Sequence, residues 1–262
     1  MPALRDHLAD EEVPMPAKVL TTAQLDAITG PQGPPARGRL IGELATALQP
    51  ARLAIQTPRL LAAPRGSGRT AMLLPGWKAP ESSMWPIGSF LDRLGHRTTG
   101  WGLGTNQGTV EAFRDQLVER VPTLVERSGR PINLVGWSLG GVVAREVARV
   151  LPEQIHRVVT FGTPAVGGPT YTIGAASFGE EESTRIRELQ EEMDVAEPIR
   201  VPITAIFTRR DAAVDWRACI DRASTDVTMV EVTSTHIGLG LDPDVWLTAA
   251  RALAESSDNK TS

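Results

Sequence analysis

The residues best suited to chemistry lie in the stretch 132–141, which reads Ile-Asn-Leu-Val-Gly-Trp-Ser-Leu-Gly-Gly. An apolar, β-prone run ends in Gly-x-Ser-x-Gly, and apolar residues then recur at helical spacing. This order predicts a strand, a sharp turn with Ser138 at its apex, and a helix. Such a turn strains the serine backbone, and Gly136 and Gly140 remove side chains that would clash. We therefore expect Ser138 to present its hydroxyl as a nucleophile.

A serine nucleophile needs a general base, and histidine is the usual one. The chain has four histidines, of which His7 lies in a polar N-terminal stretch, and His96 and His156 adjoin strand-like segments. We expect these three to be structural. His236 instead follows the strand-like residues 227–232, in a loop that contains glycines. Loops at the ends of sheet strands hold the chemistry of α/β folds, so His236 is the predicted base.

The histidine in turn needs a carboxylate that orients it and stabilises its protonated form. Asp211 comes just after the apolar, strand-like residues 203–207, at the position where this partner is expected. Asp215 is the alternative, but the residues between the two are expected to start a helical turn that carries it away. Asp226 lies at the start of the next strand, which is the wrong edge of the sheet. We expect Asp211 to be the acid.

The elements that must position these residues alternate along the chain after residue 70. Strand-like and helix-like segments flank Ser138. The other predicted strands are 71–74, 96–101, 158–161, 203–207 and 227–232, and the other predicted helices of this region are 84–94, 110–125 and 243–254. Alternation of this kind is typical of an α/β fold with a doubly wound, mainly parallel sheet. We count about six strands.

The remaining segments are expected to decorate this core. Residues 1–38 are predicted to form a flexible tail, and residues 39–62 a helical extension of the domain 39–255. The extension fits a dimer interface, part of a substrate cap, or a brace over an exposed sheet edge, and we favour the brace. Residues 164–201 interrupt the alternation, with a charged helix in their second half, and are predicted to form a small cap or lid. Residues 256–262 are predicted to be a disordered C-terminus.

Composition excludes several classes of function. A net charge of −4 gives no general attraction to nucleic acid or to an anionic membrane. The N-terminus lacks the apolar core of a signal peptide, and no apolar run approaches the ~20 residues of a membrane span, so a cytoplasmic protein is expected. The single cysteine, Cys219, excludes an intramolecular disulfide. We find no metal-ligand spacing, and the glycine-rich residues 100–104 fail the dinucleotide pattern, so neither metal nor cofactor is expected.

The order Ser138, Asp211, His236 resembles that of the α/β-hydrolase superfamily. The chain is most similar to its bacterial triacylglycerol lipase and esterase branch, over roughly residues 63 to 255. The segments that carry this likeness are Leu-Leu-Pro-Gly-Trp at 73–77, Gly-Trp-Gly-Leu-Gly at 100–104, Thr-Phe-Gly-Thr-Pro at 160–164 and Ser-Thr-His-Ile-Gly-Leu-Gly at 234–240. Many relatives have His-Gly where this chain has Pro75-Gly76.

The resemblance implies a serine carboxylic-ester hydrolase that works through an acyl-enzyme. The backbone N–H groups of Trp77 and Leu139 are expected to hold the oxyanion. Trp137 and Trp216 adjoin catalytic segments and are expected to bind an apolar acyl group, with core packing as the alternative for each. The expected substrate is a small-molecule or lipid-like ester, and a homodimer fits the exposed extension. An acyltransferase on the same residues and a non-catalytic binding protein on a hydrolase fold remain the other interpretations.

Overall fold

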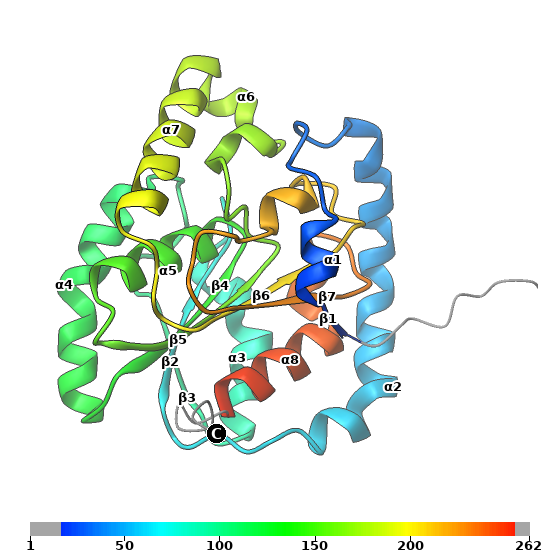
Figure 1. Ribbon diagram of the computed structural model, residues 1–262. Helices are drawn as coiled ribbons and strands as arrows, with labels where there is room; N and C mark the ends of the chain where they lie inside the picture. Colours follow the sequence, from blue (N-terminus) through cyan, green and yellow to red (C-terminus); the bar gives the residue numbers. More distant parts are fainter. Residues whose placement is uncertain (1–16, 255–262) are drawn as a thin grey trace, which may run out of the picture.

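A computed structural model describes residues 17–254 of the chain (Figure 1). Within these residues a single sheet of seven strands runs in the order β1-β7-β6-β5-β4-β2-β3. All neighbouring strands are parallel except β1, which runs antiparallel to β7. The strands are β1 (Lys18–Val19), β2 (Thr70–Leu74), β3 (Arg97–Gly100), β4 (Ile132–Trp137), β5 (Ile155–Phe161), β6 (Ile203–Phe207) and β7 (Val227–Glu231).

Helices cover both faces of the sheet (Figure 1). The α-helices are α1 (Thr22–Asp26), α2 (Gln49–Leu61), α3 (Trp85–Arg93), α4 (Val110–Ser128), α5 (Leu139–Val150), α6 (Ala175–Phe178), α7 (Glu180–Ala196) and α8 (Pro243–Ala254). The 3₁₀ segments are η1 (Arg37–Leu48), η2 (Glu81–Met84), η3 (Gly168–Tyr171), η4 (Trp216–Cys219) and η5 (Gly238–Leu241). None of the helices between residues 17 and 254 is both long and apolar enough to cross a membrane.

The core forms two layers because successive side chains of a strand point to opposite faces of the sheet. In β2, Met72 and Leu74 pack with residues of α4 and α5. Ala71 and Leu73, on the opposite face, pack with residues of α3 and α8. Burial on both faces is the reason that the inner strands β2 and β6 read as nearly continuous apolar runs. The predicted doubly wound, mainly parallel sheet is confirmed.

The N-terminal region differs from the expectation. The predicted count of six strands was one short, because β1 adds a seventh at the edge of β7. Part of the segment predicted as a flexible tail, 1–38, forms β1 and α1, and Arg222 donates to the carbonyls of Leu25 and Ile28, next to α1. A two-residue strand carries no recognisable alternation, and these contacts join residues far apart in the chain. Residues 1–16 and the predicted disordered C-terminus lie outside the described residues.

The predicted helical extension 39–62 consists of η1 and α2, which follow one another without a break along one side of the domain (Figure 1). Pro50 lies in the first turn of α2, where its missing N–H group leaves no gap in the helix. The predicted cap segment, 164–201, contains η3, α6 and α7. Figure 1 shows α6 and α7 projecting beyond the end of the sheet at which Ser138 lies.

Candidate active site

The turn that carries Ser138 joins β4 directly to α5. Ser138 has φ 51° and ψ −123°, a conformation that strains a non-glycine residue by about 1–3 kcal/mol. The predicted need for Gly136 and Gly140 is confirmed by their surroundings. A Cβ added at Gly140 would lie 2.3 Å from the carbonyl oxygen of Leu74, and one at Gly136 would lie 2.5 Å from Cα of Gly141. The turn therefore closes only with glycine at both positions.

Ser138, His236 and Asp211 form one hydrogen-bonded row. Nδ1 of His236 lies 2.7 Å from Oδ2 of Asp211, and its Nε2 lies 3.1 Å from Oγ of Ser138. An ionised carboxylate only accepts hydrogen bonds, so Nδ1 of the neutral ring carries the proton. The unprotonated Nε2 then accepts from the Ser138 hydroxyl, which is the arrangement that a general base requires.

Asp211 is itself held rigidly. Its Oδ1 accepts hydrogen bonds from the backbone N–H groups of Ala213 and Val214, at 2.9 and 2.7 Å. This leaves Oδ2 for His236, and the side chain is buried. Asp215, the alternative acid, instead accepts from the backbone N–H groups of Gln32 and Arg217. The structure thus brings Asp211, and not Asp215, to His236.

The charges around His236 favour the protonated form of its ring more than an aqueous environment would. Burial lowers the pKa of His236, but attraction to Asp211, its hydrogen bond, and attraction to Glu43 outweigh burial and raise this pKa above its usual value. Burial lowers the pKa of His96, and burial together with nearby arginines lowers the pKa of His156 to about 4. Of the histidines in the described residues, His236 alone has a raised pKa.

The turn that follows β2 lies against Ser138, because a Cβ added at Gly76 would be 3.4 Å from the Ser138 Cβ. Trp77 comes next, so its predicted oxyanion role requires its backbone N–H to face this space. The N–H of Lys78 donates to the carbonyl of Asn106 at 2.7 Å and is engaged elsewhere. Leu139 begins α5, and the first N–H groups of a helix have no partner within it. Both residues therefore lie next to Ser138 or to the turn that contacts it, and their role as oxyanion donors stays a prediction.

Asn106 braces this turn, a role that the sequence did not reveal. Its fully buried side chain donates to the carbonyl of Pro75 at 2.9 Å and accepts from the N–H of Gly108 at 3.1 Å. Its backbone carbonyl also accepts from Lys78. The sequence offers only a weak indication of this role, which is a single amide side chain in a glycine-rich loop after a predicted strand.

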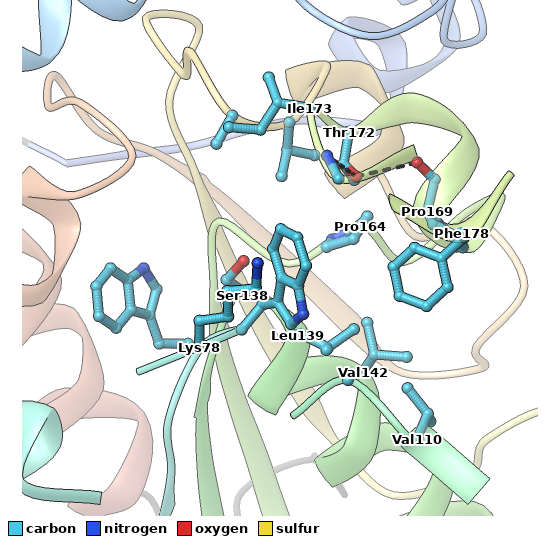
Figure 2. Close-up of a pocket in the computed structure, with 18 of the residues that line it drawn as sticks. Lys78, Val110, Ser138, Leu139, Val142, Pro164, Pro169, Thr172, Ile173 and Phe178 are labelled. Atoms are coloured by element: carbon cyan, nitrogen blue, oxygen red, sulfur yellow. Dashed lines mark hydrogen bonds between the residues drawn. The ribbon is translucent and has the colours of Figure 1, made fainter. Parts of the chain in front are cut away.

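A cavity of about 560 Å³ opens above Ser138. In Figure 2, Val110 and Val142 lie at the lower right of this cavity, Phe178 of the cap segment lies above them, and Ile173 of the same segment lies at the top. The cap segment contributes Pro164, Gly168, Pro169, Thr172, Ile173, Gly174, Phe178, Ile186, Leu189, Gln190 and Met193 to the lining. Most of these groups are apolar. No group of three or more side chains in residues 17–254 is arranged to hold a metal ion.

The tryptophans take different positions around this cavity. Trp137 lines it, as does Trp77, whose ring lies 6.3 Å from that of Phe178. The expectation that Trp216 binds substrate disagrees with its position. Its ring stacks on Phe207 and lies beneath the guanidinium group of Arg209, away from the cavity lining. Trp216 packs in the core because η4 turns it back onto β6.

Glu43 is a second residue that sequence reasoning missed. It lines the cavity from η1, and its carboxylate accepts hydrogen bonds from the backbone N–H groups of His236 and Ile237. These residues are separated by more than 190 positions, and nothing in the local pattern of residues 39–62 marks Glu43 as different from a surface carboxylate.

Comparison with solved structures finds the same fold in several proteins, two of which are lipolytic enzymes. A metagenome-derived lipolytic enzyme, from work on LipS and LipT, is 18% identical with a TM-score of 0.54, over 73% of this chain and 94% of that one. Lipase B of Aspergillus fumigatus is 14% identical with a TM-score of 0.57, over 73% of this chain but 55% of that one. A Listeria innocua protein is 14% identical with a TM-score of 0.57, over 74% and 97%. At these identities the likeness establishes the fold.

The model of the alpha/beta hydrolase family matches residues 71–259, which is most of the chain. This range contains the turn around Ser138, the residues Asp211 and His236, and both predicted oxyanion donors. The chain belongs to the α/β-hydrolase family.

Proposed function

We propose that the protein is a serine carboxylic-ester hydrolase with Ser138 as nucleophile, His236 as general base and Asp211 as its orienting acid. The observation that carries this proposal is the hydrogen-bonded row of these three side chains, of which Ser138 and His236 line an apolar cavity. Family membership and lipolytic neighbours of the same fold support a hydrolase, and the row supports a serine mechanism.

The first half of the reaction forms an acyl-enzyme. Oγ of Ser138 attacks the ester carbonyl while Nε2 of His236 takes the hydroxyl proton. The N–H groups of Trp77 and Leu139 stabilise the resulting oxyanion. His236 then gives its proton to the departing alcohol oxygen, and the C–O bond of the ester breaks.

The second half repeats these steps with water. His236 takes a proton from a water molecule, whose oxygen attacks the acyl carbonyl. The tetrahedral intermediate collapses, the proton returns to Oγ of Ser138, and the carboxylic acid leaves. Asp211 stays ionised and stabilises the imidazolium form of His236 in both halves.

The cavity supports an ester with an apolar acyl group. Its lining combines aliphatic side chains of α4 and α5 with Ile173, Phe178 and Ile186 from the cap segment. Apolar chains gain free energy by leaving water for such a surface, at about 25 cal/mol per Å². Residues 164–201 therefore act in this proposal as a cap that contacts the acyl chain.

Labelling with a fluorophosphonate tests the proposal without knowledge of the natural ester. We expect covalent labelling at Ser138, mapped by peptide mass spectrometry, with a rate that depends on pH. Because only neutral His236 can accept the proton, and its pKa is raised, the rate should fall as the pH drops through a value above about 6.5. Absence of labelling would favour a non-catalytic binding protein. We call this fall in rate at low pH the acid limb of the pH profile. Labelling at a rate that shows no acid limb would contradict the assignment of His236 as the base.

Phe178→Ala tests the cap. Loss of its ring removes apolar contact only from acyl chains long enough to reach the cap segment. We expect kcat/KM for long-chain p-nitrophenyl esters to fall roughly tenfold and that for the acetate ester to stay unchanged. The control is Val195→Ala, because Val195 is an exposed residue of α7 that does not line this cavity. An equal loss for all chain lengths would contradict a role in acyl selection.

A further inference from the structure

The segment from Glu43 in η1 to Arg52 in α2 contacts the loop that carries His236. From residue 41 to 48 only two residues, Glu43 and Thr46, are half-buried while the others are exposed, and Gln49 beyond them is buried. This spacing of three follows from 3₁₀ geometry, in which residues i and i+3 lie above one another. The inward side of residues 41–49 is thus a single line of polar side chains.

Each residue of this line contacts a different position of the loop, in reverse chain order. Thr46 shares a hydrogen bond with the Thr235 hydroxyl at 2.7 Å, and Gln49 donates to the Ser234 hydroxyl at 3.1 Å. Arg52, one step further, donates to the carbonyl of Thr233 at 3.2 Å. Together with Glu43, which contacts His236, these residues make four contacts at successive positions of the loop.

Glu43 makes the contact nearest to the reacting atoms. Its Oε1 accepts from the backbone N–H of His236 at 3.0 Å, and its Oε2 accepts from that of Ile237 at 2.9 Å. Hydrogen bonds to a charged acceptor are stronger than neutral ones, and two of them fix both position and orientation. The backbone of His236 is held by Glu43 while its ring is held by Asp211.

The far end of the line is anchored to the rest of the domain. Arg52 forms an ion pair with the buried Asp242 at 2.6 Å, and both Arg52 and Arg59 contact Asp244 at the start of α8. The loop is packed closely against this line, since a Cβ added at Gly238 would lie 3.2 Å from Nε2 of Gln49. Little room remains for the loop to shift.

We propose that residues 43–52 form a clamp that positions the histidine loop for catalysis, with Glu43 as the positioning residue for His236. This inference rests on the proposed serine mechanism and assigns a role to the segment that the sequence suggested as a brace. A brace would stabilise the sheet edge, whereas the clamp sets the geometry and charge around the base. A displacement of about 1 Å at a reacting group can lower a rate about a hundredfold, so the two roles are separable.

The charged groups that act on His236 come from two elements. Asp211 approaches its ring from the loop after β6, and Glu43 approaches from η1. Burial lowers the pKa of His236, while attraction to both carboxylates raises it. Removal of the Glu43 charge should therefore lower the pKa of His236, and the acid limb of the activity profile should move to lower pH.

The decisive variant is Glu43→Gln, which keeps size but replaces one acceptor oxygen with an NH₂ group that faces an N–H donor. We expect kcat for p-nitrophenyl esters to fall roughly ten- to a hundredfold, with KM little changed. The acid limb of kcat/KM should shift to lower pH. Glu43→Asp keeps the charge and loses reach, so it should lower kcat while its acid limb stays near that of the wild type.

Two further variants act as controls. Glu126→Gln removes one exposed carboxylate near the end of α4, roughly 18 Å along the helix from the cavity-lining Arg114. It should leave both kcat and the acid limb unchanged. Thr46→Val removes one contact of the clamp without a change in charge, so kcat should fall and the acid limb should stay. If Glu43→Gln does not fold, Thr46→Val and Glu43→Asp test the clamp.

A measurement independent of activity separates this inference from the proposed function. NMR titration gives the pKa of the His236 ring, and hydrogen exchange reports the protection of the amides of residues 236 and 237. In Glu43→Gln both the pKa and the protection should fall. An unchanged pKa and unchanged protection would overturn the clamp even if the wild type is an active esterase. A wild type without fluorophosphonate labelling would overturn the proposed function, whatever these values show.

Discussion

Ser138→Ala is expected to lower kcat for p-nitrophenyl esters by about 10⁴-fold or more, with little change in thermal stability. The three residues of the row act as a unit, so removal of the nucleophile removes the whole covalent path. Alanine and serine both carry a Cβ, so the strain at φ 51° is the same for the two side chains. Ester hydrolysis followed at 405 nm and a thermal melt give the two values.

Ser177→Ala is the matched control, because Ser177 is an exposed serine on α6 in the cap segment. Its kcat should equal that of the wild type. If Ser138→Ala kept more than a tenth of the wild-type rate, Ser138 would not be the nucleophile.

Asp211→Asn is expected to lower kcat by roughly 10³- to 10⁴-fold with the fold intact. The oxygen of the new amide can keep the two hydrogen bonds from Ala213 and Val214. Its NH₂ group then faces Nδ1 of His236, which must act as acceptor. The ring proton moves to Nε2, and the atom that faced Ser138 as a base becomes a donor.

Asp215→Asn is the comparison that separates the two carboxylates. Asp215 contacts Gln32 and Arg217 and makes no contact with His236 in the structure. The kcat of Asp215→Asn should therefore stay within a few-fold of the wild-type value, a far smaller loss than that of Asp211→Asn. Steady-state kinetics of both variants, with circular dichroism as the check on folding, decide the assignment. The opposite ranking would show that Asp215 supports the histidine.

The local pattern was sufficient for most of the core. The predicted strand 203–207 and the predicted helix 243–254 coincide with β6 and α8, and the strand, turn and helix around Ser138 lie where the glycine spacing placed them. These elements bury apolar runs or apolar faces. Their apolar residues therefore recur at a regular spacing, which predicts the type of element from neighbouring residues. The glycines at 136 and 140 were informative for a similar reason, since only a very tight turn excludes a Cβ at both positions.

The failures concern contacts between distant parts of the chain. Two residues of β1 pair with β7, across about two hundred positions, and too few residues are involved to leave a pattern. Trp216 looked equivalent to Trp137 because both adjoin catalytic segments, yet the turn of η4 directs one ring into the core while the other lines the cavity. Asn106 and Glu43 are single polar residues in segments without any distinguishing period.

The sequence by itself determined the doubly wound sheet, the strained turn that presents Ser138, and the order of serine, acid and histidine along the chain. The strained turn depends on residue types within a few positions of one another, because backbone sterics and apolar burial act locally. The sheet and the order of the three residues follow from the succession of such local patterns along the chain. Only the tertiary structure decided that Asp211 reaches His236, that the cap segment lines the cavity, and that Glu43 holds the histidine loop. Those outcomes depend on how loops and helices far apart in the chain pack together, and a directional hydrogen bond between them has no counterpart in the local sequence.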